Sequence, residues 1–98
     1  MKALTITYQP KWSSTPLNSC LLIIESVNCD KNENIINGTL KFYYNSNSFI
    51  VKCEPFSIVS LAFKVDDLDG KLSRFNSELE LAYFLAKNIL KDAKEIEV

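Results

Sequence analysis

From Ala3 to Val65 the chain alternates between apolar and polar residues with the two-residue period of β-strands. This alternation predicts half-buried strands over residues 3–8, 35–44, 48–53 and 57–65. Residues 20–27 differ, because their first five positions are all apolar, which is typical of a central strand covered on both faces. The pattern therefore predicts at least five strands in sequence.

Two short polar segments decide how these strands connect. A turn at residues 45–47 predicts a hairpin between 35–44 and 48–53, and both of the turn lengths that fit keep the same faces together. Residues 66–70 end in Asp69-Gly70, a pair that favours a type I′ turn. After that turn, residues 71–75 are either a short sixth strand or part of a loop.

One strong helical pattern follows, over residues 77–93. Ser77 is a typical N-cap, and Glu80 three residues later completes a capping box in which its carboxylate accepts the Ser77 N–H. At 100° per residue, eight apolar residues share one broad face, with Leu85 and Ile89 near its middle. These eight are Leu79, Ala82, Tyr83, Leu85, Ala86, Ile89, Leu90 and Ala93. Residues 95–98 are expected to form a frayed tail.

Leu81 and Phe84 lie outside this apolar face. They project towards the polar side of the helix, three residues apart. Either the nearby loop 66–76 covers them, or they form a small exposed apolar patch for a partner.

The 98-residue chain is expected to form one domain, residues 1–98. The predicted fold is α+β: an antiparallel meander of five or six strands with one C-terminal helix on a sheet face.

Several kinds of chemistry are excluded by composition. The chain has no His, two Gly and one Arg, so His-dependent nucleophilic sites, glycine-rich phosphate loops and Arg clusters are absent. The acidic run Asp66, Asp67 and Asp69 does not fit a calcium loop, because Val65 and Asn76 occupy its first and twelfth positions. We therefore expect no enzymatic activity, no cofactor and no metal.

The first residues alternate between apolar and polar side chains and do not form the continuous apolar segment of a signal peptide. No apolar run in the chain approaches the length of a membrane span. We therefore expect a cytoplasmic protein without a membrane partner.

Cys20 and Cys53 lie in apolar strand patterns and are expected to behave as small apolar residues, whereas Cys29 lies in a polar stretch. Trp12, in the loop over 9–18, is expected to pack over the sheet edge.

Charge is distributed unevenly. Residues 1–65 carry six lysines and four acids, whereas residues 66–98 carry eight acids and five bases. The acids concentrate around the 66–80 segment, next to the two apolar residues outside the helix stripe. The predicted partner-binding residues are Asp66, Asp67, Asp69, Glu78, Glu80, Leu81 and Phe84. This surface predicts an inhibitor or immunity-type protein that neutralises a basic toxin or nuclease by direct binding.

Two alternatives belong to other classes. Lys41, Tyr43 and Lys52 could form a nucleic-acid-binding sheet face, although the net charge of −1 disfavours it. A structural or assembly subunit could instead associate with copies of itself, through a sheet edge or the Phe84 patch.

Overall fold

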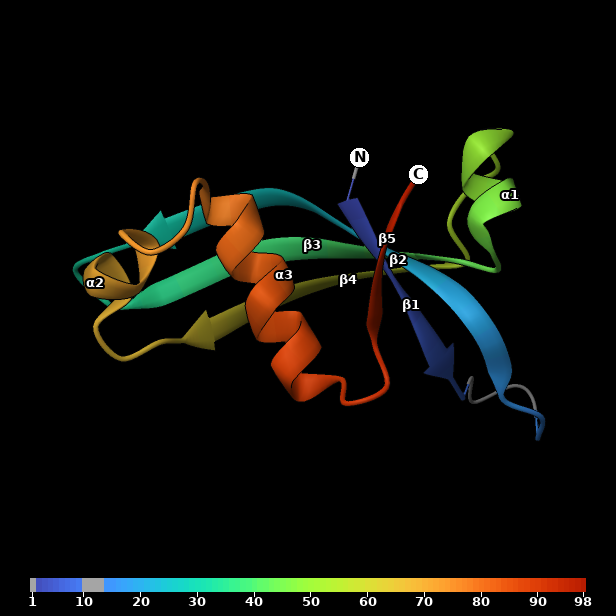
Figure 1. Cartoon of the computed structure of the whole chain (residues 1–98), viewed down its shortest axis with the longest axis horizontal. Helices are drawn as coiled ribbons and strands as arrows, with labels where there is room; N and C mark the ends of the chain where they lie inside the picture. The colour runs from blue at the N-terminus through green and yellow to red at the C-terminus, as the bar shows by residue number, and fades with distance from the viewer. Residues whose placement is uncertain (1, 10–13) are drawn as a thin grey trace.

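A five-stranded antiparallel sheet forms the frame of the molecule, as Figure 1 shows for the computed structural model, which describes residues 2–9 and 14–98. Its strands are β1 (Lys2–Tyr8), β2 (Leu17–Asp30), β3 (Ile35–Tyr43), β4 (Ser57–Lys64) and β5 (Lys94–Glu97). The helices are α1 (Ser46–Ile50), α2 (Leu68–Leu72) and α3 (Glu78–Ile89). The strand order is β4-β3-β2-β1-β5, with the C-terminal helix α3 in contact with β2. The predicted α+β fold is confirmed.

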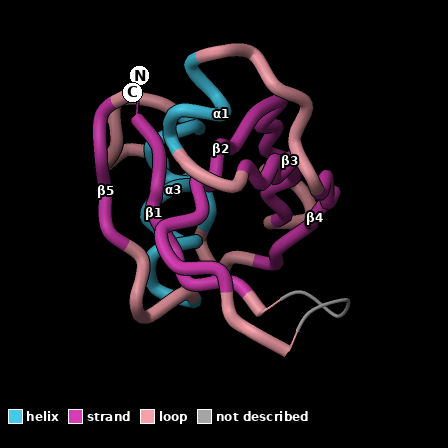
Figure 2. The backbone as a smooth tube through the Cα atoms, turned by 90° about the vertical axis from the view of Figure 1, so that its right-hand side faces the viewer, coloured by secondary structure: helices cyan, strands magenta, loops and turns pink. Residues whose placement is uncertain are grey.

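The first and last strands lie side by side. β1 pairs with β2 on one side and with β5 on the other, where Lys2 lies opposite Glu97. The two ends of the chain therefore lie close together, as Figure 2 shows. The prediction that residues 95–98 are a frayed tail was wrong, because Lys94 to Glu97 pair with β1 as a strand.

The middle of β2 is buried on both faces, as its continuous apolar run predicts. Leu22 and Ile24 face α3 and pack with Leu4 and Phe42. The residues that alternate with them face the other way and pack with Ala3 and Tyr43; they are Leu21 and Ile23. The sheet therefore supports one core on each face.

The predicted hairpin between 35–44 and 48–53 was wrong. Residues 46–50 form the short helix α1, which begins because the Asn45 side chain accepts the Ser48 N–H at 2.8 Å. β3 pairs instead with β4, in one continuous register from Ile35–Lys64 to Phe42–Ser57. Phe49 packs edge-on against Tyr43 at 5.2 Å and helps cover the sheet face away from α3.

Residues 71–75 do not form a sixth strand, because the Asp-rich segment starts a helix and not a hairpin. Asp67 has a left-handed backbone (φ 53°) and caps α2 by accepting the Gly70 N–H at 3.4 Å. A Cβ at position 70 would meet the Asp67 carboxylate, so a larger residue there would displace the side chain that caps α2. An Asp-Gly pair can thus serve a helix start as well as a type I′ turn.

The capping box of α3 is confirmed in part. The Ser77 hydroxyl accepts the Glu80 N–H at 3.2 Å, as predicted. The Glu80 carboxylate accepts the Asn76 N–H at 3.0 Å, and not the predicted Ser77 N–H. The helix ends at Ile89, four residues before the predicted end, so that the chain can turn back into β5.

Two further sequence predictions concern single residues. Cys20 is fully buried, as predicted, but Cys53 lies after α1 and is exposed, so its prediction as an apolar core residue was wrong. Trp12 lies outside the described residues. Among the described helices, none has the length and apolar character needed to cross a membrane.

Candidate functional site

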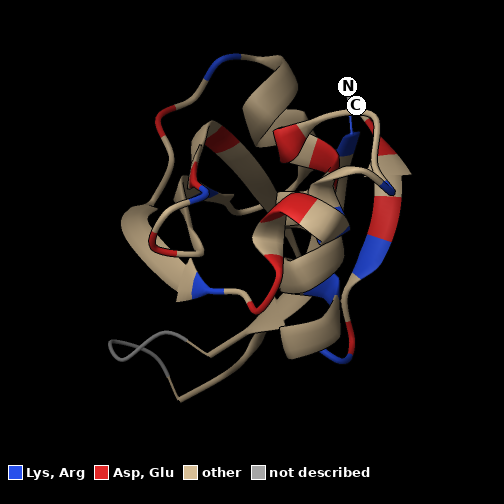
Figure 3. Cartoon of the chain, turned by 90° about the vertical axis from the view of Figure 1, so that its left-hand side faces the viewer, with Lys and Arg blue, Asp and Glu red and all other residues tan. Residues whose placement is uncertain are grey.

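Four of the predicted acidic residues lie exposed at one end of the molecule. Asp66 and Asp67 follow β4, Asp69 lies in α2, and Glu78 begins α3. Figure 3 views the molecule from the side on which α2 lies, with the carboxylate residues in red. The topology thus brings the end of β4 and the starts of α2 and α3 to one end of the sheet.

Three of the five predicted acidic residues have local structural roles, and the fifth, Glu80, is partly buried. Asp67 caps α2, and Glu80 holds the Asn76 N–H before α3. Asp69 forms an exposed ion pair with Lys31 at 2.9 Å, and its hydrogen bond and charge raise the pKa of that lysine. Lys31 therefore offsets part of the negative charge at this end.

Leu81 does not belong to a surface patch. Its side chain is 0% exposed and packs with Ile36, Val65 and Leu68. The helix pattern places Leu81 towards solvent, but α2 and the end of β4 cover that side of α3. The prediction of Leu81 as a partner-binding residue was therefore wrong.

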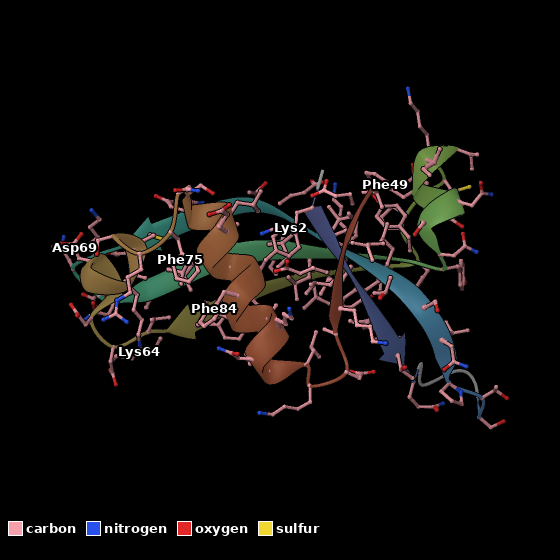
Figure 4. All side chains as sticks on the ribbon, viewed as in Figure 1. Lys2, Phe49, Lys64, Asp69, Phe75 and Phe84 are labelled. Carbon is pink, nitrogen blue, oxygen red and sulfur yellow. The ribbon has the colours of Figure 1, made fainter. Side chains whose placement is uncertain are left out.

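Phe84 is 46% exposed and forms an aromatic pair with Phe75, their ring centroids 5.2 Å apart. Phe75 comes from the loop between α2 and α3, and Figure 4 shows both rings at the same end of the molecule as Asp69. Sequence reasoning missed Phe75, because no periodic pattern includes a loop residue. We call Phe75 and Phe84 the aromatic pair.

Cys29 lies beside the acidic end. Burial raises the pKa of its thiol, and the neighbouring Glu78 raises it further through its charge and a hydrogen bond. Since the thiolate is the nucleophilic form, this environment opposes reactivity at neutral pH.

The residues of the nucleic-acid alternative are engaged within the chain. Lys41 forms an ion pair with Glu25 at 2.8 Å. Tyr43 is 7% exposed and packs against Phe49, so its ring is not available for stacking on a base. Of the three candidates, Lys52 alone is exposed.

An apolar groove of about 240 Å³ lies between α3 and the face of β3 and β4. Apart from Asn37 and Gly38 its lining is apolar: Ile24, Ile36, Leu40, Phe42, Val59, Leu61, Phe63, Ala82, Ala86, Ile89 and Leu90. Val59 and Ile89 are 36% and 57% exposed. Ile89 was predicted near the middle of the apolar helix face, but it is exposed because α3 packs mainly on β2 and β1.

Across residues 2–9 and 14–98, no three His, Cys, Asp or Glu side chains are grouped to hold a metal ion. No family model, curated protein or solved structure matches the chain. The functional argument therefore rests on the surfaces described above.

Proposed function

We propose that this chain is a non-enzymatic protein-binding protein of the inhibitor or immunity type, whose partner is a basic protein such as a toxin or nuclease. The observation that carries the proposal is the exposed Phe84 ring, paired with Phe75 at the acidic end of the molecule. Protein interfaces commonly combine an aromatic anchor with a polar rim.

The aromatic ring of Phe84 and the exposed carboxylates around it would have different effects on binding. Phe84 is a large apolar side chain that is already ordered by its ring partner, so burying it against a partner costs little side-chain entropy. The carboxylates of Asp66, Asp67 and Glu78 are exposed, so they would act mainly on the rate of encounter with a positively charged surface.

The test begins with immobilised wild-type chain and proteins from its source cells. Proteins retained by the wild type but lost with Phe84→Ala are identified, purified and assayed alone for enzymatic or toxic activity. We expect a basic protein whose activity falls when the wild-type chain is added. Ile50→Ala is the matched control, because Ile50 is 64% exposed but lies on α1 at the other end of the sheet.

Dissociation and association rates then distinguish the contribution of Phe84 from that of the carboxylates. Phe84→Ala should raise the dissociation rate by about tenfold or more. Asp66→Asn combined with Asp69→Asn should slow association, most visibly at low salt. The proposal would be contradicted if no protein were lost with Phe84→Ala, if the selected partner were not basic, or if it kept its full activity in the complex.

A further inference from the structure

The two edges of the sheet differ in how they are protected against pairing with another strand. β5 has four residues, three of them charged: Lys94, Glu95 and Glu97. Short, charged edge strands resist such pairing. β4, at the other edge, has eight residues and no Pro, and its register with β3 is unbroken. Its one charged residue, Lys64, lies at its end, so β4 has none of the usual protection along its length.

The backbone of β4 presents a regular row of hydrogen-bonding groups at this edge. Val65 donates its N–H to the Asn34 carbonyl at 2.7 Å, one pair beyond the register of β3 and β4. Hydrogen-bonded pairs alternate in an antiparallel ladder, so Val59, Leu61 and Phe63 direct their backbone groups towards β3. The intervening residues direct theirs outwards; they are Ile58, Ser60 and Ala62.

Both faces of this edge expose apolar side chains. Ile58 is 58% exposed on the face away from α3. Val59 lies on the α3 face with Ile89, where the apolar groove opens. A strand added beside β4 would shield the apolar side chains on both faces, Ile58 and Val59, from water.

Two residues of opposite charge, Lys64 and Glu54, flank β4, and Asp66 and Asp67 follow the end that carries Lys64. Lys64 ends the strand, as Figure 4 shows, and Glu54 lies three residues before its start. Lys41 projects from the sheet face away from α3, and Glu54 lines the same surface hollow as Lys41. Lys64 lies on the same face, because it alternates with Phe63 of the groove. Antiparallel pairing of two copies would bring Lys64 of each close to Glu54 of the other.

We propose that β4 pairs antiparallel with β4 of a second copy, joining two sheets into one across a two-fold axis. Residues directly opposite in such a pair share a face, so both α3 helices lie on the same side of the joint sheet. The two apolar grooves then open towards each other over a continuous floor formed by Val59, Leu61 and Phe63 of both copies. This inference is independent of the proposed partner at the acidic end.

The test measures molar mass by light scattering from about 1 μM to about 1 mM, a range that covers weak dimers. We expect the mass to rise from that of one chain to that of two. Hydrogen exchange identifies the interface: the amides of Ile58, Ser60 and Ala62 should exchange more slowly as concentration increases.

Two variants change the edge itself, and a third is a control on α1. Ile58→Lys should weaken dimerisation by at least about tenfold, whereas Ile50→Lys, at a similarly exposed isoleucine on α1, should not. Ser60→Pro removes an outward N–H that would bond to the second copy, so it should also weaken dimerisation, and an edge strand tolerates proline there. Circular dichroism checks that each variant folds.

A charge exchange tests the antiparallel orientation. Lys64→Glu and Glu54→Lys should each weaken the dimer, and the double variant should recover it. A chain that stays monomeric over the whole range would overturn the proposal. A dimer that Ile58→Lys leaves intact, with unprotected β4 amides, would also overturn it, because the interface would then lie elsewhere.

Discussion

Tyr83 joins α3 to the sheet through one buried hydrogen bond. The pairing of β1 with β2 reaches Leu4–Leu22, so the N–H of Ile24 lies beyond it and needs another acceptor. The Tyr83 hydroxyl accepts that N–H at 2.9 Å, and its side chain is 1% exposed. Burial also raises the pKa of Tyr83 above its ordinary value. A polar atom in the core thus fixes the position of the helix.

Tyr83→Phe should lower the free energy of unfolding by about 1–3 kcal/mol, because it leaves the buried Ile24 N–H without a partner. It should also change the response to alkali. Above pH about 10, tyrosine ionises in the unfolded chain before it does in the fold, so unfolding is favoured as pH rises through the folded pKa. Urea denaturation at pH 8 and pH 11 measures both effects, and Tyr44→Phe, at an exposed tyrosine, is the control. A loss of stability equal to that of the control would contradict the role of this bond.

Leu81 and Phe84 test how far helix periodicity can assign burial. Leu81→Ala should cost about 2–5 kcal/mol, because the side chain is fully buried. Phe84→Ala should cost less than about 1 kcal/mol, since nearly half of the side chain is already in water and mainly its contact with Phe75 is lost. Thermal melts of the two variants should therefore differ clearly; equal losses would place both residues in the core.

At the scale of elements, alternation and periodicity predicted four strands and the main helix close to their observed positions. They failed where local hydrogen bonds or distant pairing decide the structure. Asn45 and Asp67 start short helices by capping, although the residues around them also fit a strand or a turn. β5 exists because β1 lies beside it, which no local pattern of residues 94–97 reveals. The acidic end was predicted from charge alone, but Phe75 and the apolar groove depend on how the elements pack.

Asp92 links the turn before β5 to β1 and provides a test of this connection. Its carboxylate accepts the Thr7 N–H at 3.0 Å, and that bond lowers the pKa of the carboxyl group. The resulting stabilisation is present above the ordinary carboxyl pKa of about 4 and is lost as pH falls through the folded pKa.

Asp92→Asn should therefore make stability less dependent on pH below about 5. Urea midpoints from pH 6 to pH 2 measure the difference from wild type, with Glu33→Gln as a control in an exposed turn. An unchanged pH dependence would show that the Thr7 contact does not persist in solution.

For the whole molecule, the important feature is uneven cover of one sheet face. α3 is the only long helix among the described residues, and it packs on β2 and β1. The apolar positions of β3 and β4 remain partly open, which gives the groove and exposes Val59. The molecule extends 40 Å along its longest axis, whereas a twelve-residue helix is about 18 Å long. The two-copy inference follows from this same imbalance.

If the groove is open in solution, it should accept a larger side chain. Ala82→Leu places extra methyl groups at a position that lines the groove, so stability should stay within about 1 kcal/mol of wild type or rise. Ala93→Leu is the matched control, because Ala93 is 7% exposed within the packed core and overpacking there should cost about 1–3 kcal/mol. Urea denaturation compares the two variants at one protein concentration. If Ala82→Leu destabilised the chain as much as Ala93→Leu, α3 would have to pack closely on β3 and β4 in solution, and the floor proposed for the two-copy assembly would already be covered.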